Sequence, residues 1–162
     1  MSKSQLPEQQ EPLAAKYLAR EEALSRIGGD AKSILIGTQM ELVNQWCEQI
    51  HRNTPSADVY FYGTSISSVS NVKYHSFIKV KPELGMAYTL DYLAKVAPAV
   101  WKLQQNCPSY FLVAFPCVKH MAARFDQWFD YAIEDEYQPN RGPHAIRDVI
   151  RNAGMHLIAV HR

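Results

Sequence analysis

Residues 110–120 read YFLVAFPCVKH, an almost unbroken apolar run that meets a proline and continues into an amphipathic segment. An apolar run of this kind is typical of a central strand that is covered on both faces. From about Val118, apolar residues recur at helical spacing as far as Ala132. The stretch therefore predicts a buried strand followed directly by a helix, which is the repeating unit of α/β proteins.

The same alternation continues on both sides of this stretch. Further strands are predicted at residues 33–37, 58–63, 72–81 and 155–160, and further helices at residues 12–27, 39–52, 86–104 and 144–153. The order α-β-α-β-β-α-β-α-α-β predicts an α/β or α+β fold, with a mixed sheet of about five strands and helices on both faces. Residues 1–11 are polar and predict a disordered N-terminal tail, which leaves residues 12–162 as a single globular domain.

The composition argues against several broad classes of function. The 162 residues are 47% hydrophobic and 20% charged with a net charge of +1, so the overall charge favours neither nucleic acid nor an anionic membrane. The three cysteines form no Cys-x-x-Cys pair, which argues against a disulfide framework and indicates a cytoplasmic location. No apolar run approaches the roughly 20 residues that span a bilayer, so no membrane partner is expected.

The strand predicted at residues 72–81 has one cationic face. Side chains alternate along a strand, so Val72, Tyr74, Ser76, Ile78 and Val80 are expected to face the core, whereas the opposite face carries Lys73, His75, Phe77, Lys79 and Lys81. With Tyr60 and Tyr62 on that second face, the surface would offer cations for phosphates and rings for bases, as single-stranded nucleic acid requires. The alternative is a solvated face, or an edge strand whose lysines prevent aggregation.

A second basic surface is predicted near the C-terminus. Arg147 and Arg151 share one face of the predicted helix with His144, opposite an apolar face. The preceding helix is expected to extend to about residue 136 and to carry an exposed acidic stretch, made of Asp126, Asp130, Glu134, Asp135 and Glu136. The arginines would bind phosphate or, alternatively, pair with that acidic helix.

Cys117 is the candidate for covalent chemistry. It falls where the predicted strand ends and the helix begins, so unpaired backbone N–H groups would stabilise a thiolate there. His120 follows three residues later and can reach the thiol on the same side of the first turn. This spacing predicts a nucleophilic or redox-active thiol. The alternative is a structural cysteine, because cysteine is one of the most buried residue types.

Other familiar sites are missing from the sequence. Cys117 and His120 supply only two ligands where zinc needs three or four, so neither a metal nor a cofactor is predicted. The loop GTSISSVSN at residues 63–71 lacks the P-loop pattern and is interpreted as a hairpin connection. The order of elements also fits small metal-dependent nucleases, but no acid stands two residues before Lys79 or Lys81.

Three hypotheses of different classes follow. The first is a non-enzymatic binding or adaptor protein that contacts nucleic acid through the basic strand and the C-terminal basic helix. The second is a small thiol-dependent enzyme that uses Cys117 with His120. The third is a protein-interaction module without chemistry, anchored by aromatic side chains such as Tyr92 and Trp101.

Overall fold

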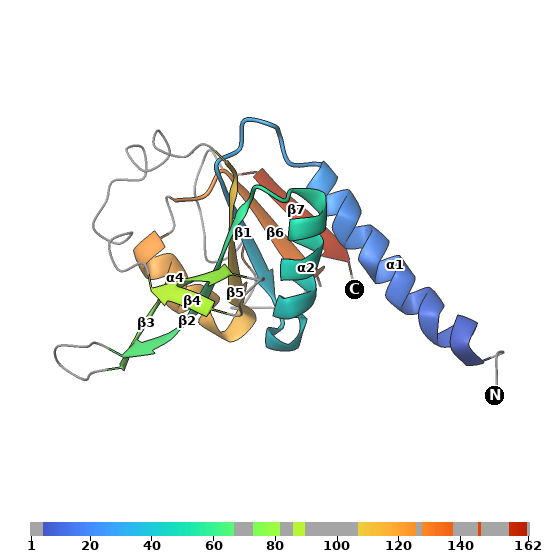
Figure 1. The fold of residues 1–162 in the computed structure, drawn as a ribbon, viewed down its shortest axis with the longest axis horizontal. Coiled ribbons are helices and arrows are strands. Elements are labelled where there is room, and N and C mark those ends of the chain that lie inside the picture. Colours follow the sequence, from blue (N-terminus) through green and yellow to red (C-terminus); the bar gives the residue numbers. More distant parts are fainter. Residues whose placement is uncertain are drawn as a thin grey trace.

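The computed structural model describes residues 5–66, 73–81, 86–89, 107–125, 128–137, 146 and 156–161 (Figure 1). The helices are α1 (Gln5–Ser25), α2 (Val43–Asn53) and α4 (Val118–Phe125), with short 3₁₀ turns η1 (Met40–Leu42) and η3 (Phe115–Cys117). The strands are β1 (Ser33–Thr38), β2 (Asp58–Ile66), β3 (Lys73–Lys81), β4 (Met86–Thr89), β5 (Ser109–Ala114), β6 (Tyr131–Tyr137) and β7 (His156–His161).

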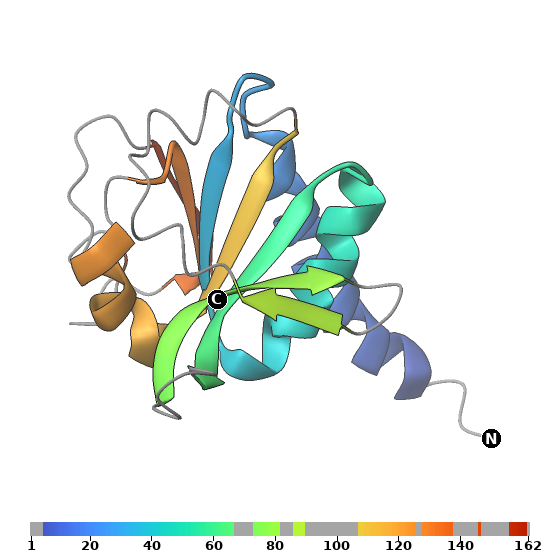
Figure 2. The ribbon, with the colours of Figure 1, turned by 60° about the vertical axis from the view of Figure 1, so that its left-hand side comes forward.

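These strands form one mixed sheet in the order β4-β3-β2-β5-β1-β6-β7. The strands from β2 to β7 in that order run parallel, while β3 and β4 are antiparallel additions at one edge. Helices α1 and α2 cover one face and α4 covers the other (Figures 1 and 2). The predicted α/β class with helices on both faces is therefore confirmed, although the described sheet has seven strands and not about five.

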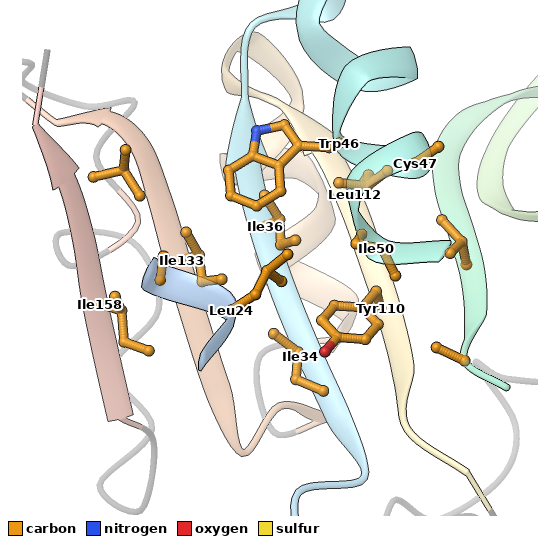
Figure 3. Close-up of a cluster of buried hydrophobic side chains, with 14 of the residues drawn as sticks. Leu24, Ile34, Ile36, Trp46, Cys47, Ile50, Tyr110, Leu112, Ile133 and Ile158 are labelled. Carbon is orange, nitrogen blue, oxygen red and sulfur yellow. The ribbon is translucent and has the colours of Figure 1, made fainter. Parts of the chain in front are cut away.

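Strand β1 is the central one of the five parallel strands and is buried along its whole length. Its side chains alternate between the two layers: Ile34 and Ile36 point to the α1–α2 side, and Leu35 points to the α4 side. Figure 3 shows Trp46 of α2 lying above Ile36, with Leu24 of α1 close to Ile34. Each face of β1 thus contributes to a separate apolar core, as a parallel strand covered on both sides requires.

The structure corrects the prediction of one long helix over residues 118–136. Helix α4 ends at Phe125, and Tyr131–Tyr137 form β6, which pairs in parallel with β1. Trp128, Phe129 and Ala132 continue the apolar spacing of α4 beyond its end, although they lie in the connection to β6 and in β6 itself. The acids were misjudged as a consequence: Glu134 is 0% exposed and Asp135 is 2% exposed, so they do not form a solvated helix face.

The prediction of a helix over residues 86–104 is wrong at its start. Residues Met86–Thr89 form β4, which pairs antiparallel with residues Ile78–Lys81 of β3. Short segments follow their pairing partners more than their own propensity, and Tyr and Thr suit a strand. The rest of that predicted helix lies outside the described residues, as does the predicted helix 144–153 apart from Ile146. Helix α1 begins at Gln5, inside the segment for which the sequence predicts a disordered tail.

Replacement of Ile36 by Ala tests whether β1 is the centre of the core. Ile36 is 0% exposed, so the truncation leaves a cavity beneath Trp46 and should lower the free energy of unfolding by about 2–5 kcal/mol. Leu18→Ala is the matched control, because Leu18 is 65% exposed and its loss should cost less than about 0.5 kcal/mol. Urea unfolding of both variants measures the difference, and equal losses would contradict the burial of β1.

Candidate functional site

The arrangement of the sheet singles out the carboxyl ends of β1 and β5. These neighbouring parallel strands are followed by helices on opposite faces, α2 after β1 and α4 after β5. Where connections diverge in this way, doubly wound sheets leave a crevice in which ligands usually bind. The segment η3 and the first turn of α4, with Cys117 and His120, begin at this edge.

The first turn of α4 divides its residues between the core and the solvent. Val118, Met121 and Ala122 are buried against β2 and β5, which fixes the helix on the sheet. His120 lies on the exposed side of the same turn. The 3₁₀ turn η3 carries Pro116 at its start, which suits a first-turn position that needs no N–H donor.

His120 is held by a buried tyrosine. The hydroxyl oxygen of Tyr62 in β2 and Nδ1 of His120 are joined by a hydrogen bond of 2.6 Å, and Tyr62 is only 1% exposed. The half-buried ring of His75 in β3 stacks on Tyr62 at a centroid distance of 5.6 Å and lies 5.1 Å from the ring of His120. We call these three residues the imidazole cluster: a phenol beneath and two imidazoles at the surface.

Cys117 and His120 lie at the strand-to-helix junction, as the sequence predicts, but they are not paired with each other. Cys117 is half-buried against the α4-side core, and within the described part of the chain its sulfur makes no hydrogen bond. Nδ1 of His120 is engaged by Tyr62. In the structure the partner of His120 is therefore Tyr62. The sequence had instead predicted that Tyr62 lies on an open surface for nucleic acid.

That predicted surface is covered in the structure. The register places Tyr60 opposite Lys79 and Tyr62 opposite Phe77, so these residues do share one face as expected. However, this face lies beneath α4, and the exposed fractions of Tyr60, Tyr62 and Phe77 are 4%, 1% and 1%. Phe77 packs edge-on against Phe111. The expected assignment of the two faces is therefore corrected, and the three rings present no open plane to a base.

The basic residues of the same prediction are only partly described. Nζ of Lys79 lies 3.1 Å from Oδ1 of Asp58, so this lysine is already paired within the sheet. The side chains of Lys73 and Lys81 lie outside the described part, and so do Arg147 and Arg151. Phosphate binding by these four residues stays a prediction.

Sequence reasoning missed a buried carboxylate at the carboxyl end of β6. Asp135 accepts a hydrogen bond of 2.7 Å from Nε1 of Trp46 and another of 3.0 Å from Oγ1 of Thr38. Its side chain therefore joins the ends of β1 and β6 to α2. A buried indole N–H needs an acceptor, so Trp46 within an apolar helix stripe was the signal that could have revealed it.

Glu134, the neighbour of Asp135, points to the other face of the sheet. Its Oε1 accepts a hydrogen bond of 2.6 Å from the backbone N–H of Ile146. Ile146 is thereby held against β1, where a Cβ on Gly37 would come within 2.5 Å of Cδ1 of Ile146. Glycine at residue 37 is needed for this close approach, and not for an unusual backbone angle.

Burial raises the pKa of two cysteine thiols. The pKa of Cys47, on the buried side of α2, is raised to about 11, mainly by burial and further by the charge of Glu48. The pKa of Cys107 is also raised, first by burial and then by the carboxylate of Asp58. Both thiols are therefore poor nucleophiles at neutral pH.

Neither a metal centre nor a membrane segment is found in the part of the chain that the structure describes. There, no three side chains among His, Cys, Asp and Glu converge closely enough to hold a metal ion. None of the described helices combines the length and the apolar character that are needed to cross a bilayer. No protein-family model matches the chain, and no curated protein matches its sequence.

Replacement of Asp135 by Asn tests the buried carboxylate. The substitution removes the charge that accepts hydrogen bonds from Trp46 and Thr38, and should lower the free energy of unfolding by about 1–3 kcal/mol. Glu41→Gln is the control, because Glu41 is an exposed acid in η1. Urea unfolding of the two variants gives the comparison. Equal stability of both variants would show that the charge of Asp135 adds nothing to these hydrogen bonds, which the amide oxygen of Asn can also accept.

The three thiols should react with iodoacetamide in a defined order. At pH 8 a thiol with the pKa of Cys47 is about one part in a thousand thiolate, so Cys47 should be modified last. Cys107 should react earlier, and Cys117 first, since it is half-buried without a hydrogen-bond partner in the described residues. Peptide mass spectrometry over time measures the order. In urea all three should react alike, and native modification of Cys47 before Cys117 would contradict the structure.

Proposed function

We propose that this protein is an α/β enzyme that performs acid–base chemistry on a small polar ligand, with His120 as the group that exchanges the proton. The observation that carries the proposal is the 2.6 Å hydrogen bond between Tyr62 and Nδ1 of His120, beside a second imidazole. An exposed imidazole held from below by a buried hydroxyl is oriented for proton transfer at its outer nitrogen. Its position near the carboxyl ends of the strands, where such sheets bind ligands, supports the same function.

The chemistry assigns a role to each member of the imidazole cluster. A phenol can donate or accept a hydrogen bond, so Tyr62 is compatible with either tautomer of His120. When Tyr62 donates to Nδ1, the outer Nε2 of the neutral ring carries hydrogen and can donate a hydrogen bond to the ligand. When Nδ1 donates to Tyr62, Nε2 is free to accept a proton as a base, and the imidazolium that forms can return this proton as an acid. Tyr62 is therefore a positioning residue, and His75 offers a second imidazole to the same ligand.

Cys117 lies next to the proposed site but has no role in the proposed chemistry. Its place at the end of η3, immediately before α4, puts it at the same strand-to-helix junction as His120. A thiol-dependent reaction would need a hydrogen bond between His120 and Cys117, and none is found in the described part of the chain. Acid–base chemistry at His120 needs no contact with the thiol, so we favour it over the thiol-dependent enzyme.

The experiment follows the carbon-bound Hε1 signals of the six histidines by NMR while small polar fragments are added. Carboxylate, phosphate, amide and sugar fragments cover the ligand classes. A fragment that binds at the proposed site should shift the signals of His75 and His120 together and leave His156, an exposed residue at the start of β7, unchanged. Compounds related to the binding fragments are then tested for turnover, which His120→Gln should abolish and His156→Gln should preserve.

Several outcomes would count against the proposal. Fragments that shift no signal of the imidazole cluster, or turnover that survives His120→Gln, would remove His120 from the chemistry. Imidazole ¹⁵N shifts provide an independent check, because Tyr62→Phe removes the hydroxyl and should change the tautomer balance of His120. An unchanged tautomer balance would mean that Tyr62 does not position the ring.

A further inference from the structure

A buried arginine lies between α1 and α2, on the face of the sheet opposite the imidazole cluster (Figures 1 and 2). Arg20 of α1 is only 5% exposed, and its guanidinium carbon lies 5.9 Å from the centre of the Trp46 ring. A buried charge is costly unless it is paired. Within the described residues, however, no carboxylate forms an ion pair with Arg20.

The partners of Arg20 are two neutral amides. Its Nε donates to Oε1 of Gln49, and its Nη2 donates to Oε1 of Gln45 at 3.1 Å. Gln49 is itself fixed, since its Nε2 donates to the backbone oxygen of Tyr17 at 3.0 Å and to Glu21 at 3.3 Å. Because a guanidinium has five N–H donors, three of them remain for another partner. Nη1 makes no hydrogen bond within the described part and is not sealed from solvent.

These free donors face a groove of about 320 Å³ between the two helices, lined by Tyr17, Arg20, Gln45, Glu48, Gln49 and Arg52. The α2 residues in this lining occur at spacings of three and four, so they form one continuous stripe. Among the described lining residues, two guanidinium groups stand against the single carboxylate of Glu48, which gives an excess of positive charge. The groove therefore combines a cavity, a buried positive charge and N–H donors that make no hydrogen bond in the described residues.

We propose that the groove between α1 and α2 binds an oxyanion, the carboxylate or phosphate group of a small ligand. Arg20 would contact it through Nη1 and the free hydrogen of Nη2, since a planar guanidinium matches the two oxygens of such a group. Arg52 supplies the second positive charge from the exposed side of α2. The site lies apart from the imidazole cluster, so it adds a binding function that does not depend on the proposed chemistry.

Calorimetric titration with inorganic phosphate, and separately with succinate, tests this inference at constant ionic strength set with chloride. Saturable binding of either probe is expected, and the stronger of the two identifies phosphate or carboxylate as the natural group. Arg52→Gln should weaken binding by about tenfold, the usual effect of losing one charge-assisted contact. Glu48→Gln should strengthen binding, because Glu48 is the only carboxylate among the described residues that line the groove.

Arg26→Gln is the matched control, because Arg26 is an exposed arginine of the same region that does not line this groove. Arg20→Lys keeps the charge and removes the planar fork, and should abolish most of the binding. If that variant fails to fold, the inference is tested by the opposite changes that Arg52→Gln and Glu48→Gln should cause in the affinity for phosphate or succinate. Absence of saturable binding, or equal losses from Arg26→Gln and Arg52→Gln, would overturn the inference and leave Arg20 as a clamp between helices. Unchanged binding in His120→Gln would confirm that the two sites are separate.

Discussion

The burial of β1 on both faces is the constraint on which the rest of the structure depends. Ile34, Leu35 and Ile36 are 0% exposed, so each side of this strand must be covered. Parallel pairing with β5 and β6 forces connections that leave the sheet and return, and those connections supply the covering layers. The same geometry sends the connections after β1 and β5 to opposite faces, which is why their carboxyl ends form the most favourable place for a ligand.

The covering helix α4 determines which residues of β2 and β3 are accessible. Its apolar side lies over Tyr60, Tyr62 and Phe77, which removes these rings from solvent. The same packing brings His120 onto the hydroxyl of Tyr62 at the margin of the helix. One packing event thus excludes base stacking by these rings and creates an oriented imidazole. For this reason we propose a localised site at His120 and not a flat basic surface of stacking rings.

The sequence predicted the layers better than the polar contacts, and particular residues show why. Alternating or continuous apolar patterns predict β1, β2, β3, β5 and β7, because the burial of a strand is visible in the residues of that strand alone. Asp135 could not be placed in the same way, because its partners Trp46 and Thr38 are 89 and 97 residues away in the chain. Acidic side chains in an acidic stretch are usually exposed to solvent. Asp135 is buried because β6 pairs in parallel with β1.

Arg20 shows the same limit and its functional consequence. In the sequence it is one charged residue in a helix, and nothing nearby indicates burial. The packing of α1 on α2 places its guanidinium carbon 5.9 Å from the centre of the Trp46 ring, while the indole N–H of Trp46 donates to Asp135. Trp46 therefore contacts both a buried cation and a buried anion. Within the described residues these two charges form no ion pair, so each needs its own compensation: Asp135 accepts hydrogen bonds from Trp46 and Thr38, whereas Arg20 donates to two amides and keeps further donors for the groove between the helices.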